Sequence, residues 1–143
     1  MKLDDAKLQT TLKQIHTGAL AAAEAAAIVD VARFAASVDG RMDMGEMATV
    51  ARLSKIIYEM SGGQESPVPS TPMPDGWLAQ IGTRLATSGP RELAYAAARL
   101  IIIADRKITK EEVDLGVKLG EALHITPART QQLDALIDAL AQA

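Results

Sequence analysis

The segment ARFAASVDGRMDMGEMATVARL, residues 32–53, aligns without gaps on ARLIIIADRKITKEEVDLGVKL, residues 98–119. The aligned pairs that are identical are Ala32 and Ala98, Arg33 and Arg99, Asp39 and Asp105, Glu46 and Glu112, and Leu53 and Leu119. Each copy is typical of an apolar helix, a tight acidic turn and a second helix. The duplication therefore predicts two helix-turn-helix repeats, over about 19–60 and 90–123, related by a pseudo-twofold axis.

The composition of the whole chain predicts an all-α fold. Of its 143 residues, 48% are hydrophobic but only 3% are aromatic, and alanine is the commonest residue. Alanine is the best helix former and a poor strand former, so β-sandwiches and barrels are excluded. The length fits a single domain with its own core. Alanine is concentrated in the helices before the acidic turns, where small side chains would let the two repeats approach closely.

Hydrophobic periodicity and turn residues predict about seven helices and no strand. The expected helices cover residues 3–16, 19–38, 44–60, 77–85, 90–104 and 109–123, and a last helix begins at 127. Asp75 is expected to cap the short helix over 77–85. The helix over 90–104 is apolar nearly all round, which predicts that it is the central helix. Residues 61–74 contain four of the six prolines and are expected to form a long irregular connection.

Charge and cysteine content exclude several classes of function. The absence of cysteine excludes disulfides and thiolate metal sites, and limits any metal to hard oxygen ligands. With a net charge of −3 and no basic block, nucleic acid is not an expected partner. The first residues lack a signal-peptide pattern and no run reaches 18 apolar residues. We therefore expect a cytoplasmic protein without direct membrane insertion.

The acidic turns resemble the second half of an EF-hand calcium loop, since they read DGRMDMGE and DRKITKEE. In that alignment the opening ligand positions fall on Ala35 and Ser37 in the first copy, and on Ile101 and Ile103 in the second. Three of these four side chains carry no oxygen, whereas calcium needs six to eight oxygen ligands. An ordinary EF-hand is therefore excluded.

Helix capping is one interpretation of the repeated acids. Asp43 and Thr109 stand three residues before Glu46 and Glu112, which is the spacing of a capping box. Such a box satisfies free backbone N–H groups and places a carboxylate at the positive end of a helix, at a gain of roughly 1 kcal/mol. Capping explains both glutamates.

A divalent-cation site is the other interpretation, and its candidate ligands are Asp39, Glu46, Asp105 and Glu112 converging across the pseudo-twofold axis. Capping explains the two aspartates less well, because an aspartate near the end of a helix meets the negative end of its dipole. A bound cation, or an ion pair with a repeated arginine, would compensate for that placement. The cation would be a hard one with oxygen ligands.

The repeated motifs resemble the TerB-like tellurite-resistance family. The resemblance is carried by VARFAASVDGRMDMGE, residues 31–46, and ARLIIIADRKITKEEVDLGVKLGEALHITP, residues 98–127, and it spans about 19–128. It implies an all-helical fold of seven helices with internal pseudo-twofold symmetry. It also implies a cytoplasmic protein of stress and tellurite resistance, without catalysis, that has a protein partner and works with membrane-associated resistance components.

The same resemblance implies metal binding through the four repeated acids. Two departures from the family pattern bear on it: Arg106 stands where glycine is usual, and Gly45 stands where a second acid is frequent. Arg106 and Lys107 also place two positive charges beside Asp105, which lowers its affinity for a cation.

Two further functions are alternatives. In the first, the chain is a metal-free interaction module that uses the 61–74 loop and its helix faces. In the second, Asp39 and Glu112 form a hydrolase, which would require a pocket of substrate size. His124 is expected in the last turn of its helix in a structural role. The methionines are expected to fill gaps in the core.

Overall fold

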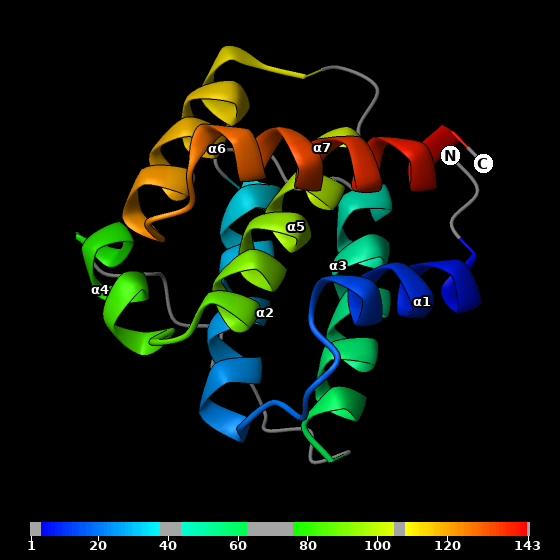
Figure 1. The fold of residues 1–143 in the computed structure, drawn as a ribbon. Coiled ribbons are helices and arrows are strands. Elements are labelled where there is room, and N and C mark those ends of the chain that lie inside the picture. The colour runs from blue at the N-terminus through cyan, green and yellow to red at the C-terminus, as the bar shows by residue number, and fades with distance from the viewer. Residues whose placement is uncertain (1–3, 38–43, 63–75, 105–107, 143) are drawn as a thin grey trace.

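A computed structural model describes residues 4–37, 44–62, 76–104 and 108–142, and these contain seven helices and no strand. The helices, labelled in Figure 1, are α1 (Asp5–Ile15), α2 (Ala22–Ser37), α3 (Met44–Met60), α4 (Trp77–Arg84), α5 (Ser88–Ala104), α6 (Lys110–Ala122) and α7 (Pro127–Gln142). The prediction of an all-α bundle is confirmed. Within this part of the chain, none of the helices has the length and apolar character that crossing a membrane requires.

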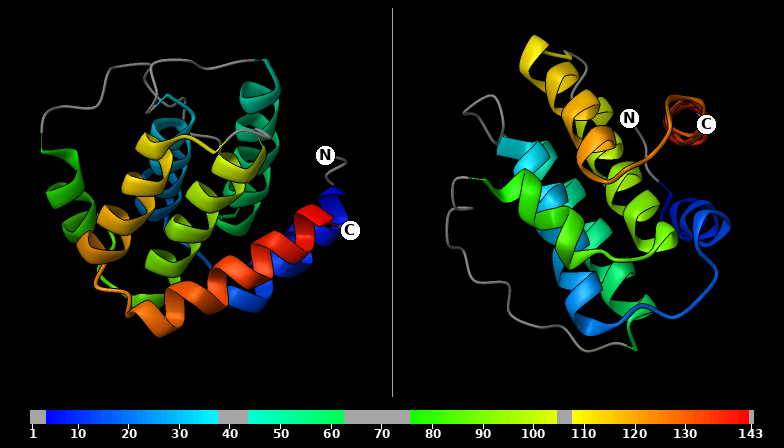
Figure 2. Two further views of the ribbon diagram at one scale, coloured as in Figure 1. Left: turned by 90° about the horizontal axis from the view of Figure 1, so that it is seen from above. Right: turned by 60° about the vertical axis from the view of Figure 1, so that its left-hand side comes forward.

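Helix α5 is the central element, as its apolar sequence predicts. It contacts α1, α2, α3, α6 and α7, and Figures 1 and 2 show it between them. Its most extensive contact is with α2. Both helices bury alanines, namely Ala25, Ala27, Ala32, Ala35 and Ala36 of α2 and Ala94, Ala96, Ala97 and Ala98 of α5. The two apolar helices of the repeats therefore pack on each other, as expected from their small side chains.

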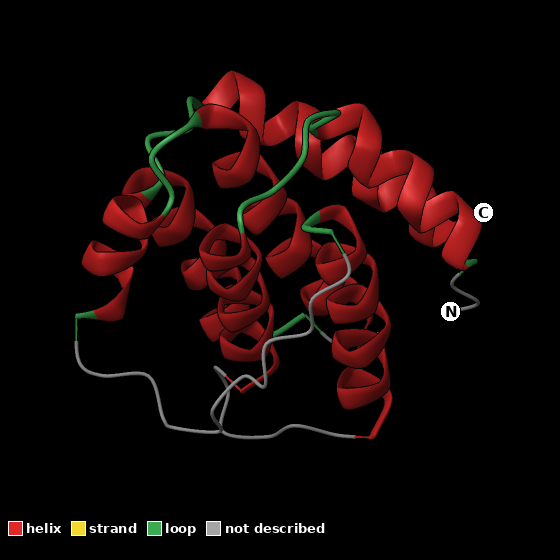
Figure 3. Cartoon of the chain, turned by 90° about the horizontal axis from the view of Figure 1, so that it is seen from below, coloured by secondary structure: helices red, strands yellow, loops and turns green. Residues whose placement is uncertain are grey.

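Helices α1 and α7 cover another side of α5. They contact each other and α5, and Figure 2 shows them side by side, with the start of α1 near the end of α7. The stripes that face inward are Leu8, Leu12 and Ile15 on α1, and Leu133, Ile137 and Leu140 on α7. Figure 3 shows how short loops join helices at the ends of this bundle. The first and last helices thus close the core around the repeats.

Several helix boundaries differ from the sequence prediction, for local reasons. Helix α2 begins at Ala22 rather than near 19, because the Glu24 carboxylate accepts a hydrogen bond from the Ala21 N–H at 2.9 Å and so fixes the first turn. Helix α4 has Gly76 as its N-cap, with φ 81°, and no side chain caps it. The predicted cap, Asp75, lies outside the described residues.

Two expectations about single side chains were wrong. His124 lies beyond the end of α6 with φ 57°, because the helix ends at Ala122, so it is not in the last turn. Met44 and Met47 are 86% and 55% exposed and do not fill gaps in the core, whereas Met60 packs against it as expected. Of the expected irregular connection, residues 61–62 form a turn after α3 and 63–74 lie outside the described part of the chain.

Candidate functional site

The structure places two of the four predicted metal ligands. Glu46 and Glu112 lie in the first turns of α3 and α6 and are only 4% and 2% exposed. Asp39 and Asp105 lie outside the described residues. Among the residues described, no group of three or more acidic or histidine side chains is arranged to hold a metal ion. The convergence of the four acids therefore stays a prediction.

The capping interpretation is confirmed for the second repeat. The Thr109 hydroxyl oxygen accepts a hydrogen bond from the Glu112 N–H at 3.2 Å, and Glu112 Oε1 accepts from the Thr109 N–H at 3.0 Å. The Thr109 hydroxyl also contacts Glu112 Oε1 at 3.1 Å. These bonds form the reciprocal capping box that the spacing predicts. The matching residue of the first repeat, Asp43, lies outside the described residues.

A cavity of about 360 Å³ lies between α5, α6 and α7, next to Glu112. Most of its wall is apolar, formed by Ala98, Ile102, Val113, Val117, Leu119 and Ile125. Gly116 and Gly120 lie on its α6 side. A Cβ atom added at Gly116 would meet no atom within 4 Å, whereas one at Gly120 would lie 3.3 Å from Thr130 Cγ2. The absence of side chains at these two positions therefore helps to keep the cavity open.

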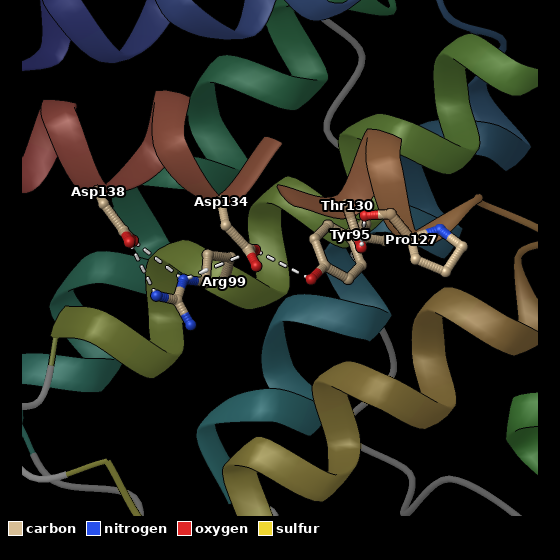
Figure 4. Close-up of polar contacts among 6 residues, drawn as sticks. All are labelled: Tyr95, Arg99, Pro127, Thr130, Asp134 and Asp138. Atoms are coloured by element: carbon tan, nitrogen blue, oxygen red, sulfur yellow. Dashed lines mark hydrogen bonds and ion pairs between the residues drawn. The ribbon is translucent and has the colours of Figure 1, made fainter. Parts of the chain in front are cut away.

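A polar network joins α5 to α7 beside this cavity, as Figure 4 shows. The Tyr95 hydroxyl donates to Asp134 Oδ1 at 2.9 Å. Arg99 donates through two nitrogens to Asp138, at 3.0 and 2.9 Å, and lies 3.7 Å from Asp134. Bidentate bonds of this kind fix the guanidinium in one orientation. Arg99 is therefore directed chiefly at Asp138, and Asp134 receives its strongest bond from Tyr95.

Burial is the largest cause of the pKa shifts of Asp134 and Tyr95 in this network. Removal from water raises the pKa of Asp134 above its usual 3.8, while the Tyr95 hydrogen bond and the Arg99 charge act in the opposite direction. Burial, followed by the hydrogen bond to Asp134, raises the pKa of Tyr95 as well. Its hydroxyl is therefore protonated at neutral pH and acts as a donor. The contacts of Asp134 with Tyr95 and Arg99 thus offset only part of the effect of burial on its pKa.

The described lining of the cavity has more acidic than basic side chains. Its ionisable lining residues are Glu112, Glu121, Asp134 and Arg99, and the charge of Arg99 is already shared with Asp138. Such a lining attracts cations and repels anions. On the described wall, the Glu112 carboxylate accepts hydrogen bonds from Thr109, and the Tyr95 hydroxyl donates a hydrogen bond to Asp134.

Sequence reasoning missed the cavity and the network around it. The signal that could have indicated the cavity was the pair Gly116 and Gly120, since glycine within a helix costs about 1 kcal/mol relative to alanine. For the network, Asp134 and Asp138 are spaced to share one face of α7. Arg99, which bonds to Asp138 and lies near Asp134, was notable in the sequence only because it aligns with Arg33.

An apolar face of α6 borders the cavity. Val113 and Val117 line it and are 54% and 60% exposed, one helical turn apart. We call these two residues the α6 apolar face. Val113 aligns with Met47 of α3, which is also exposed. Both repeats thus expose an apolar side chain at the same position of their second helix.

Searches of protein-family models, curated protein sequences and solved structures give no match to this chain. The likeness to TerB-like proteins is therefore carried by the repeated motifs alone.

Proposed function

We propose that this protein is a non-catalytic binding domain, similar to TerB-like proteins, that acts in cytoplasmic stress or tellurite resistance by holding a protein partner. The observation that carries the proposal is the α6 apolar face, Val113 and Val117. Isolated exposed apolar side chains are ordinary on a protein surface. Here two of them adjoin an apolar cavity, and larger exposed apolar areas of this kind mark interaction sites.

The polar groups near this face favour binding over chemistry. Tyr95 is held protonated beside Asp134, and Thr109 holds the Glu112 carboxylate in the capping box. A hydrolase would need the pair Asp39 and Glu112. Of these two residues, only Glu112 lies in the part of the chain that the structure describes. A binding domain uses the same residues as a rigid frame that positions α6 against α5 and α7.

The double variant Val113→Lys, Val117→Lys tests this function. Both side chains are exposed, so the variant should keep its helical circular dichroism, and it should lose the proteins that the wild type captures in a pull-down. Glu111→Gln, Asp114→Asn is the matched control, because these residues are exposed on α6 and the change in net charge is the same. The control should capture as the wild type does.

Deletion of residues 61–74 separates this surface from the loop. Capture that survives the two lysine substitutions but is lost on deletion would contradict the proposal and assign the partner to the loop. Loss with the lysines and survival of the deletion would support the α6 face. Cross-linking before the pull-down would identify the partner in each case.

A divalent cation at the acidic turns is the second candidate function. It is favoured by the matching positions of Glu46 and Glu112, which lie in the first turn of the second helix of each repeat, where a carboxylate could act as an oxygen ligand. A cation at one hundred times its Kd would stabilise the fold by about 2.7 kcal/mol, which is about 10 °C in Tm. Titration with calcium, magnesium, manganese and zinc measures this shift.

The variant Asp39→Asn, Asp105→Asn should abolish that shift while leaving the Tm in chelator unchanged. An unchanged Tm with all four cations would exclude the cation site. The partner-binding function would remain, because it depends on a different set of residues.

A further inference from the structure

We propose that the cavity between α5, α6 and α7 binds a small organic cation with an apolar body, for which Asp134 is the counter-ion. This ligand site goes beyond the binding of a protein partner. The cavity volume of about 360 Å³ lies within the range of roughly 300–1,000 Å³ that is usual for small-molecule sites. Such sites combine an apolar wall with a few polar groups that orient the ligand.

The shape of the cavity depends on Gly116. Glycine is the least favourable ordinary residue inside a helix, and this one neither ends α6 nor relieves a close contact, because its Cβ would meet nothing within 4 Å. Open space beside a helix backbone is what a bound molecule requires. Ala98 and Ile102 of α5 and Val113 of α6 supply apolar surface to that space.

The charge of the cavity selects a cation. Asp134 lies on the wall, and its only described hydrogen bond comes from the Tyr95 hydroxyl, which carries no charge. Arg99 is 3.7 Å from Asp134 but makes both of its bonds of 2.9–3.0 Å to Asp138. Figure 4 shows Asp134 between Tyr95 and Arg99. An ammonium group would therefore gain an attraction that is stronger in this partly buried position than in water.

The size of the cavity favours a free small molecule over a side chain of a partner protein. The cavity, at about 360 Å³, is larger than a single lysine side chain. A lysine side chain has a four-carbon stem and one nitrogen, about five heavy atoms, and would fill less than half of it. A compound with a ring and a short aminoalkyl chain fits better.

Titration with 2-phenylethylammonium tests the proposal, followed by amide chemical shifts of the full chain in NMR. The neutral 2-phenylethanol and the anionic 3-phenylpropionate are matched in their apolar body. We expect the ammonium to bind about tenfold more tightly than the alcohol, with shifts at Gly116 and Gly120, and the carboxylate to bind most weakly. Equal affinity of the three compounds, a preference for the carboxylate, or no binding by any of them would overturn the proposal.

Two variants locate the site. Gly116→Leu fills the cavity and should abolish binding of all three compounds, whereas Lys118→Leu adds the same side chain to an exposed position of α6 and should not. Asp134→Asn retains an acceptor for Tyr95 but removes the charge, so it should abolish the tenfold preference. Asp114→Asn removes an exposed α6 charge away from the cavity and should preserve it.

The variants Gly116→Leu and Asp134→Asn test two different properties of the site, its space and its charge. Circular dichroism checks each fold, and Asp134→Asn tests the charge independently of Gly116→Leu. An unchanged preference in Asp134→Asn would overturn the role of this carboxylate. Tighter binding of Nα-acetyl-lysine methylamide than of 2-phenylethylammonium would overturn the choice of a free small molecule and assign the cavity to a partner's lysine.

Discussion

The two helix-turn-helix repeats share a sequence pattern but pack differently. In the first, α3 lies along both α2 and α5, and its contact with α2 is among the most extensive in the molecule. In the second, α6 has a much smaller contact with α5 and also touches α4, while α7 packs on α5. Helix α3 of the first repeat therefore packs closely into the core, whereas α6 of the second repeat leaves the cavity between α5, α6 and α7.

Differences at matching positions account for this contrast. Val50 of α3 packs against the core, and its counterpart in α6 is Gly116, beside the cavity. Val29 of α2 is buried and apolar, and its counterpart Tyr95 donates a hydrogen bond to Asp134 of α7. A few side chains thus decide that α3 packs closely in one repeat while α6 borders a cavity in the other.

The largest effect is expected from shortening the matched core leucines. Leu53 and Leu119 are both fully buried, but Leu119 also lines the cavity. Leu53→Ala should lower the free energy of unfolding by about 4 kcal/mol, and Leu119→Ala by about 2.5 kcal/mol, because a side chain beside empty space loses fewer contacts. Urea denaturation of the two variants measures the difference. Equal losses would show that the second repeat is packed as tightly as the first.

The next effect concerns the ion pairs of each repeat. Arg99→Met should lower the free energy of unfolding by about 2 kcal/mol, because it breaks two charged hydrogen bonds to Asp138. Arg52→Met in α3 should cost less than about 0.5 kcal/mol, since its pair with Asp5 is well exposed. Thermal and urea unfolding of both variants test this ranking. A reversed order would contradict the structural role of the α5–α7 network.

Removal of the helix cap should have a smaller effect. Thr109→Ala deletes the hydroxyl that caps α6 and should cost about 1 kcal/mol of stability. Glu112→Gln keeps the capping-box geometry and is the control. The parallel change Asp43→Ala sharpens the comparison, because an equal loss would indicate that the first repeat has the same box. A loss confined to Thr109→Ala would make capping a feature of the second repeat.

The smallest effect is a gain in stability. Gly116→Ala should stabilise the fold by about 0.5–1 kcal/mol, because alanine is the better helix former and its Cβ meets nothing within 4 Å. Gly120→Ala should gain less, since its Cβ would lie 3.3 Å from Thr130 Cγ2. Differential scanning calorimetry of both variants measures the change in Tm. A loss of stability on Gly116→Ala would mean that other atoms of the protein lie where the structure has open space beside Gly116.

Local patterns allowed much of the fold to be predicted from the sequence. The helices follow from apolar residues that recur every three or four positions, and the central place of α5 follows from its apolar surface on all sides. The capping box at Thr109 and Glu112 and the ion pair between Asp30 and Arg33, at 3.7 Å, are contacts three residues apart. Such contacts depend on helix geometry alone, so spacing was sufficient to predict the capping box.

Only the tertiary structure brought together groups that lie far apart in the chain. Asp30 also pairs with Arg84 of α4 at 2.9 Å, and Arg99 bonds to Asp138, 39 positions away. No periodicity within one helix indicates which face of another helix it will meet. The helices and the capping box of α6 were therefore determined by the sequence on its own, while the cavity and the α5–α7 network were decided by how α6 and α7 pack on α5.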